Sequence, residues 1–446
     1  MSGPVVIELG DAAPWRPPEQ AFARRPPRWL AVLVVAALAA GLPVADTAAG
    51  GPVLRVGTGA LGMLPGGGRL FLTRFTGEGP HRLEAYDGGG AALWSRALAD
   101  GRQVAYAGAD VVLVTNQPTG LPAALATLSA LDPGTGAELW SRGAASILGR
   151  AGELLLYEDT REWAGTEPAG LPALRVAAVR ARTGALVWER SVPGGFPVTF
   201  GRDLRRPYDV TSFNVLDPDN TLRAYDLATG AVLRTDRLRG LGVPGGFQVG
   251  DDGRDGGPPG ARAGQVAVFS SDTGDDEVYD RASGRLLWSA GPGGNGGLTG
   301  CATGLWCRRD GPALVALDAA TGRPAWRADG YDSVIGGGRG ALLLGLSRGT
   351  EATLLAVDAR TGAVRRRLDG WHPIQADGNR VVVWRRDEDE LAVIVGVVDP
   401  ATGHVAVVGT GDAWGGPPGC AADGDLLACG VVGDMTAWRL PPAIRD

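Results

Sequence analysis

The stretch ALDPGTGAELW at residues 130–140 returns as ALDAATGRPAW at residues 316–326. In both copies an aspartate follows two small or apolar residues, a glycine stands four positions later, and a tryptophan stands four positions after that. The carboxylate of such an aspartate accepts backbone N–H groups, and glycine adopts the left-handed backbone conformation without steric cost. The motif therefore predicts a tight turn between two β-strands.

Copies of this motif run along most of the chain. Eight of them are anchored at Asp87, Asp132, Arg180 (in place of aspartate), Asp226, Asp280, Asp318, Asp358 and Asp399. Successive anchors are 45, 48, 46, 54, 38, 40 and 41 residues apart. This period is typical of a four-stranded propeller blade. The expected fold is therefore an all-β propeller of four-stranded antiparallel blades.

The motif also supplies residues for packing. Its turn glycines are Gly136, Gly184, Gly230, Gly284, Gly322, Gly362 and Gly403. Tryptophan is kept in five of the eight copies, as Trp94, Trp140, Trp188, Trp288 and Trp326. Its flat side chain is expected to pack against the neighbouring blade. The runs at residues 111–114, 342–344 and 381–384 are apolar without alternation, which indicates strands that are buried on both faces.

These repeats resemble the quinoprotein-like (PQQ-like) propeller repeat over residues 53–440. That family includes pyrroloquinoline-quinone alcohol dehydrogenases and the lipoprotein propeller of the bacterial outer-membrane β-barrel assembly machine. The resemblance implies the fold but no particular activity, because one fold hosts many functions. Eight complete copies predict eight blades, within a range of seven to nine. Residues 435–440 read as a degenerate ninth copy that would close the ring with a strand near residues 53–56.

The composition excludes some classes of partner. Glycine (72) and proline (31) are abundant, as expected where tight turns join many short strands. All 43 basic residues are arginine, which indicates a GC-rich genome such as that of an actinobacterium. The net charge is −6, and no basic run is present that would neutralise a row of phosphates. Nucleic acid is therefore not an expected partner.

The N-terminal part of the sequence predicts a membrane anchor. Residues 29–45 are uncharged and mostly apolar, and Arg24, Arg25 and Arg28 precede them, which favours a transmembrane signal anchor with a cytoplasmic N-terminus. The alternative is a signal peptide cleaved after small residues near Thr47 and Ala49. The predicted organisation is a proline-rich leader (1–28), the anchor (29–45), a linker (46–52), the propeller (53–440) and a tail (441–446). The predicted location of the propeller is outside the cytoplasm, at the cell membrane, or secreted if the segment is cleaved.

All four cysteines lie beyond the apolar segment, where an oxidising compartment allows disulfides. Their close spacing predicts two pairs, Cys301 with Cys307 and Cys420 with Cys429, each joining the two strands of a hairpin. Cys307 and Cys429 precede the turn positions of their repeats by eleven and ten residues. Both pairs are therefore expected on the same hairpin of two different repeats. The alternative is a zinc site built from all four thiolates.

Other motifs are interpreted as loops. Residues 57–62 match GxGxxG, but proline and glycines follow instead of the helix that a dinucleotide site requires. Residues 345–349 match the GxSxG of a nucleophile elbow, but another repeat strand follows. His81, His372 and His404 are expected on different repeats and lack metal-ligand spacing. The acidic groups at residues 272–277 and 387–390 lack an EF-hand pattern and are expected to be solvated turns.

For the family's dehydrogenases, the resemblance implies a disulfide of adjacent cysteines over the quinone, a calcium or lanthanide ion and an aspartate base. This chain has no adjacent cysteines, and we expect no catalytic, cofactor-binding or metal-binding residues and no cofactor. The expected function is a non-catalytic binding or scaffolding module for an extracytoplasmic protein or cell-envelope polymer. The alternative is a quinone-dependent dehydrogenase of alcohols or sugars. The sequence leaves the ligand and the oligomeric state open.

Overall fold

The protein is described by a computed structural model. It describes residues 51–57, 59–75, 77, 80–98, 102–116, 127–143, 145–159, 173–192, 198–203, 206–217, 219–239, 244–249, 264–270, 274–292, 297–302, 304–338, 340–346, 353–377, 380–387, 392–412, 419–431 and 434–440. Ala49–Asp446 forms one compact unit. The predicted leader, anchor and tail lie outside the described residues. Within the described part, no helix has the length and apolarity that crossing a bilayer requires.

The described residues form 36 strands and no helix, arranged as nine four-stranded blades. Blade 1 consists of β2 (Ala60–Gly66), β3 (Arg69–Arg74), β4 (Arg82–Asp87) and β5 (Ala92–Ala97). Blade 2 consists of β6 (Arg102–Ala107), β7 (Val112–Asn116), β8 (Thr127–Leu131) and β9 (Glu138–Gly143). Blade 3 consists of β10 (Ala145–Ala151), β11 (Leu154–Asp159), β12 (Leu174–Arg180) and β13 (Leu186–Val192). Blade 4 consists of β14 (Val198–Asp203), β15 (Arg206–Leu216), β16 (Thr221–Tyr225) and β17 (Val232–Arg237). Blade 5 consists of β18 (Pro244–Val249), β19 (Gln265–Ser270), β20 (Asp275–Asp280) and β21 (Arg285–Pro292).

Blade 6 consists of β22 (Thr299–Ala302), β23 (Leu305–Asp310), β24 (Ala313–Asp318) and β25 (Pro324–Asp329). Blade 7 consists of β26 (Ser333–Gly338), β27 (Ala341–Gly345), β28 (Thr353–Asp358) and β29 (Val364–Asp369). Blade 8 consists of β30 (His372–Asp377), β31 (Arg380–Asp387), β32 (Ala392–Asp399) and β33 (His404–Asp412). Blade 9 combines β34 (Gly419–Asp423), β35 (Leu426–Val431) and β36 (Asp434–Arg439) with β1 (Leu54–Val56) from the other end of the compact unit.

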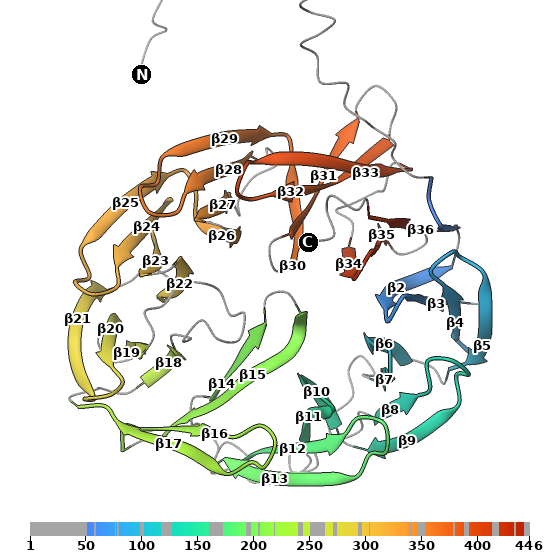
Figure 1. Ribbon diagram of the computed structural model, residues 1–446, viewed down its shortest axis with the longest axis horizontal. Coiled ribbons are helices and arrows are strands. Elements are labelled where there is room, and N and C mark those ends of the chain that lie inside the picture. Colours follow the sequence, from blue (N-terminus) through green and yellow to red (C-terminus); the bar gives the residue numbers. More distant parts are fainter. Residues whose placement is uncertain are drawn as a thin grey trace, which may run out of the picture. The chain divides into compact units, whose positions relative to one another are not determined.

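Within blades 1 to 8 the strands pair antiparallel in chain order. The first strand of each blade lies toward the centre of the ring, and the fourth lies at the rim (Figure 1). One departure joins two blades, because β10 of blade 3 also pairs in parallel with β15 of blade 4, Arg150 opposite Asp209. The hairpin of β14 and β15 reaches further toward the centre than those of the other blades (Figure 1).

The ring closes through β1, whose Leu54 and Val56 pair with Ala437 and Met435 of β36. This closure confirms the expectation for residues 435–440. The count of eight blades is corrected to nine. Blade 9 lacks the aspartate-glycine turn because its fourth strand comes from the other end of the ring, so no hairpin turn is needed between its third and fourth strands.

The hydrophobic core lies between the blades. Each of the nine buried clusters contains side chains from two consecutive blades, and the cluster of Val56, Leu70 and Leu426 joins blade 9 to blade 1. The apolar runs at 111–114, 342–344 and 381–384 are buried along their whole length. This burial on both faces explains why those strands show no polar alternation.

A β-bulge recurs in the fourth strand of the blades. In blade 3, Ala178 pairs with Trp188 but the next residue, Val179, pairs with Leu186, so that Val187 is left over. The same shift occurs one residue before the tryptophan, or the residue in its place, in blades 1, 2, 4, 5, 6 and 7. A bulge re-aims the side chains that follow it. Its regular place accounts for the common orientation of the tryptophans.

Candidate functional site

The anchor aspartates form hydrogen bonds within their own turns. At Asp358, Oδ1 accepts the backbone N–H of Thr361 at 3.0 Å and its hydroxyl at 2.9 Å. Hydrogen bonds from Arg365 and then Thr361 lower the pKa of this carboxyl to about 2. Hydrogen bonds from Thr229 and Ser283 likewise lower the pKa of Asp226 and of Asp280. These carboxylates are committed to shaping turns.

The other anchors follow the same plan with local changes. Asp87, Asp132, Asp318 and Asp399 also accept hydrogen bonds from residues of their turns. Arg180 has no carboxylate that could accept hydrogen bonds from the turn, and its guanidinium forms an ion pair with Glu153 at 2.7 Å. The backbone N–H of Gly184 still donates to the Arg180 carbonyl at 2.8 Å. The backbone turn therefore forms without the aspartate.

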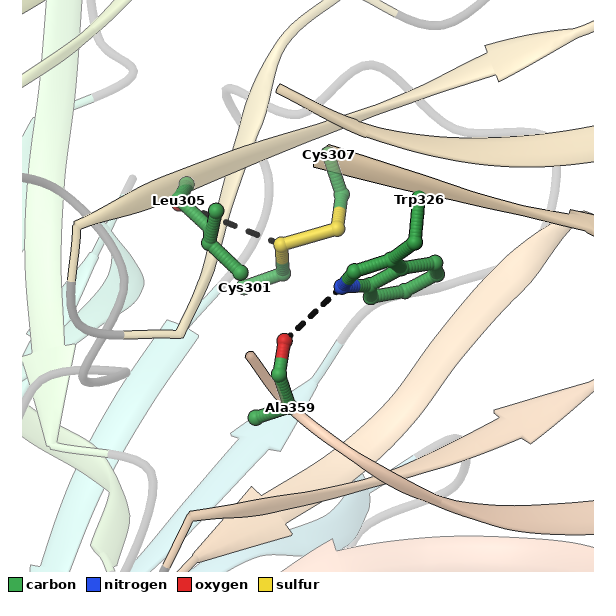
Figure 2. The surroundings of a disulfide bond; sticks show 5 residues. All are labelled: Cys301, Leu305, Cys307, Trp326 and Ala359. Atoms are coloured by element: carbon green, nitrogen blue, oxygen red, sulfur yellow. Dashed lines mark hydrogen bonds between the residues drawn. A yellow bond between two sulfur atoms is a disulfide. The ribbon is translucent and has the colours of Figure 1, made fainter. Parts of the chain in front are cut away.

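Each motif tryptophan contacts the turn of the next blade. The indole N–H of Trp326 donates to the carbonyl oxygen of Ala359, the residue after anchor Asp358, at 2.8 Å (Figure 2). The ring covers Gly362, where a Cβ atom would lie 2.7 Å from the indole. We call this pair of contacts the indole clasp. The other four clasps pair Trp94 with Pro133 and Gly136, Trp140 with Ala181 and Gly184, Trp188 with Leu227 and Gly230, and Trp288 with Ala319 and Gly322.

In two of the three copies that lack the tryptophan, those of blades 4 and 7, arginine side chains take part in the contact with the next blade instead. In blade 4, Arg234 stands in its place and donates to Asp236 at 2.6 Å, while Arg281 of blade 5 donates to the other oxygen of Asp236 at 2.6 Å. In blade 7, a Cβ atom on Gly403 would lie only 2.8 Å from the Cβ atom of Arg366. The turn glycines are therefore required for space as well as for backbone conformation. At Gly284, a Cβ atom would collide with the carbonyl oxygen of Arg237.

Both predicted disulfides are present. Cys301–Cys307 joins β22 to β23 in blade 6, with the Cα atoms 5.6 Å apart, and Cys420–Cys429 joins β34 to β35 in blade 9, with the Cα atoms 4.1 Å apart. Each lies on the first hairpin of its blade, as the register predicted. All four thiols are used, which excludes the zinc alternative. Figure 2 shows Trp326 beside the first disulfide, and these residues share one buried cluster.

Replacing Cys301 and Cys307 by alanine is expected to lower stability by about 2 to 3 kcal/mol at most, because the disulfide closes only a short loop in the unfolded chain. The variant should fold, with a thermal midpoint a few degrees lower and the second disulfide intact. The matched control replaces Cys420 and Cys429. Peptide mapping without reduction checks the pairing, and a cross-linked peptide containing one cysteine from each pair would contradict the blade register.

The remaining polar motifs do not assemble into a site within the described residues. No group of three histidine, cysteine, aspartate or glutamate side chains in that part of the chain is placed to hold a metal ion. His372 and His404 lie on the first and last strands of blade 8, which corrects the expectation of separate repeats. His372 stacks on Trp384 with ring centroids 4.6 Å apart. Burial and the nearby Arg386 lower the pKa of His372.

The acidic groups have individual roles. Glu277 accepts a hydrogen bond from the Tyr279 hydroxyl at 2.5 Å. Asp276 is buried, which corrects its expected place in a solvated turn, and burial raises its pKa against the opposing effect of Arg308. Asp272 and residues 388–390 lie outside the described part.

The two enzyme-like motifs lie at strand ends. Residues 60–62 of the GxGxxG match begin β2, and Gly345 of the GxSxG match ends β27. Residues 347–349 lie outside the described part. A quinone-capping disulfide of adjacent cysteines does not fit the pairs found here, because both join hairpin strands and Cys301 and Cys307 are buried between blades. The disulfides therefore have structural positions.

The structure reveals one surface that the sequence analysis missed. On the outer strands of blades 3, 4 and 5, the second and third residues after the turn glycine are large, apolar and 40 to 66% exposed. We call this surface the outer apolar wall, and it consists of Leu186, Val187, Val232, Leu233, Leu286 and Leu287. Aligning the repeats on their glycines would have revealed the pairs, but not that these residues face outward.

Comparison with known proteins identifies the family. The sequence profile described as outer membrane protein assembly factor BamB matches residues 34–206, 218–329 and 272–429. No curated protein sequence matches the chain. The crystal structure of BamB from Moraxella catarrhalis is 17% identical with a TM-score of 0.41, over 87% of this chain and 100% of that one.

Two further solved structures are similar at this low level. The computationally designed Ika8 protein is 15% identical with a TM-score of 0.46, over 76% of this chain and 95% of that one. A europium-containing methanol dehydrogenase is 13% identical with a TM-score of 0.37, over 87% of this chain and 93% of that one. The profile match covers most of the ring, and the chain therefore belongs to the PQQ-like β-propeller family described as outer membrane protein assembly factor BamB.

Proposed function

We propose that this chain is a non-catalytic scaffold that binds another protein outside the cytoplasm. The observation that carries the proposal is the family match along residues 34–429, to a family described as an assembly factor. The structural roles of the motif residues support it. The anchor aspartates hold turns, the tryptophans hold neighbouring blades together, and the cysteines join hairpins. Those residues are used in building a rigid ring.

The proposed location is the outer side of the cell membrane, with residues 29–45 as the anchor. Two disulfides in one chain support export, because such bonds persist in oxidising compartments and are rare in the cytosol. Arg24, Arg25 and Arg28 before the apolar segment favour a cytoplasmic N-terminus. The partner would then be a protein of the cell envelope.

The experiment purifies the tagged full chain from membranes of its own cells in mild detergent. The expected result is an extracytoplasmic protein that co-purifies in fixed ratio, together with no alcohol-dependent or sugar-dependent dye reduction when pyrroloquinoline quinone and Ca²⁺ are added. Turnover of any alcohol or sugar under these conditions would overturn the non-catalytic assignment and favour the dehydrogenase alternative. Recovery of a polysaccharide in place of a protein would redirect the proposal to an envelope polymer.

A further inference from the structure

The outer apolar wall lies on three consecutive blades. β13, β17 and β21 are each at the end of their strand order and follow one another along the rim (Figure 1). The most exposed side chain is Leu233, at 66%, and each strand contributes two aliphatic residues. Exposed apolar residues that gather on neighbouring elements are typical of an interaction site, whereas singly scattered exposed residues are ordinary.

The repeat itself does not require these residues. Blade 6 forms the same indole clasp through Trp326, but its two corresponding positions hold Pro324 and Ala325. In blade 2, the first of these positions holds Glu138. Proline and charged residues at such positions protect an edge strand from unwanted pairing. Blades 3, 4 and 5 hold aliphatic residues at the same positions and lack this protection.

Exposed positive charge borders the wall. Arg190 on β13, Arg237 on β17 and Arg285 on β21 are exposed, and none of the three forms an ion pair with another described residue. The exposed Glu189 pairs with Arg175 at 3.6 Å. The border therefore has an excess of positive charge. Charge complementarity favours a partner with carboxylates beside its apolar contact residues.

The same charges argue against two other occupants. A second copy of the wall would bring arginines against arginines, which like-charge repulsion disfavours. The chain's own apolar stretch at residues 29–45 is preceded by Arg24, Arg25 and Arg28 and followed by one carboxylate, Asp46. Its flanks therefore carry more positive than negative charge, which matches a positive border poorly.

We propose that the outer apolar wall is the docking surface for an apolar segment of a partner protein that is flanked by aspartate or glutamate residues. This inference rests on the proposed scaffold function and adds the place and the chemistry of binding. Leu233 and Leu287 lie in the bulges of β17 and β21, and both project far enough to be more than 40% exposed. They are the expected central contacts.

The first test places a photo-reactive benzoylphenylalanine at Val232 in the full chain, in its own cells. The matched control is Val364 on β29, which has the same repeat position and is 59% exposed against 50% for Val232. The expected result is an adduct at Val232, stronger than at Val364, with a peptide of another protein. Sequencing of that peptide should show an apolar stretch flanked by acidic residues. An adduct with lipid or with a second copy, a segment flanked by arginines, or equal labelling at both positions would refute the proposal.

The second test separates this inference from the scaffold function. Leu233→Ser combined with Leu287→Ser changes only exposed side chains, so the ring should keep its thermal midpoint. Retention of the co-purifying protein should fall about tenfold or more, and should stay unchanged in the control Val364→Ser. Added salt should weaken the wild-type complex. If the double variant retains its partner fully, the wall is refuted and the scaffold function stands; if the wild type has no partner, both fail.

Discussion

Replacing Trp326 by alanine is expected to destabilise the ring by about 3 to 5 kcal/mol, the range for removing a large buried aromatic side chain. Trp326 is 8% exposed and packs in the cluster that joins blade 6 to blade 7. The change also removes the hydrogen bond to the Ala359 carbonyl and uncovers Gly362. Equilibrium unfolding in urea, followed by tryptophan fluorescence and circular dichroism, measures the loss.

Two controls separate the parts of this effect. Val364→Ala removes an exposed side chain from β29 and should change stability by less than about 0.5 kcal/mol. Trp326→Phe keeps much of the packing but not the indole N–H, and should lie between the two. If Trp326→Ala behaved like Val364→Ala, the indole clasp would have no part in holding the blades together.

Replacing Val56 by aspartate is expected to cost about 3 kcal/mol or more, because it places an unpaired carboxylate in the cluster that closes the ring. Val56 is buried against residues of blades 1 and 9, and its strand is only three residues long. The predicted result is loss of β1 from β36, with amide hydrogens of β36 exchanging faster with solvent. Hydrogen exchange measured by mass spectrometry checks this result locally.

The control for ring closure is the neighbouring Arg55, which is exposed and pairs with Thr436 in the same ladder. Arg55→Ser should leave both the unfolding midpoint and the exchange of β36 close to those of the wild type. An equal loss of stability in Arg55→Ser would mean that burial of the Val56 side chain is not the cause of the effect. No effect of Val56→Asp would contradict closure of the ring through β1.

Some features of the protein could be predicted from local sequence. The spacing from Asp87 to Asp399 predicted four-stranded blades, because an aspartate-glycine turn is recognisable without knowing what surrounds it. The disulfides were predictable for a similar reason, since Cys301 and Cys420 each have a nearby partner on the same hairpin. The apolar runs predicted burial on both faces. The membrane anchor and the location of the ring stay predictions.

The blade count could not be obtained by counting turns. The ninth blade takes its outer strand from residues 54–56 and so needs no aspartate-glycine turn between its third and fourth strands. The contact between blades 4 and 5 could not be predicted from the sequence either. There, Asp236 pairs with Arg234 of its own blade and with Arg281 of the next blade, and the motif lacks its tryptophan. Both features depend on which blade lies next to which.

The sequence by itself determined the turns, the hairpin disulfides and the four-stranded repeat, because these arise from interactions between residues near one another in the chain. Only the tertiary structure decided that the ring has nine blades, that each clasping indole covers the next blade's glycine, and that the aliphatic pairs of blades 3 to 5 face outward. The physical reason is that burial depends on neighbours 30 to 50 residues away, as for Trp326 over Gly362 and Trp188 over Gly230. The sequence pattern of an apolar residue on an outer strand does not depend on whether another molecule covers that residue.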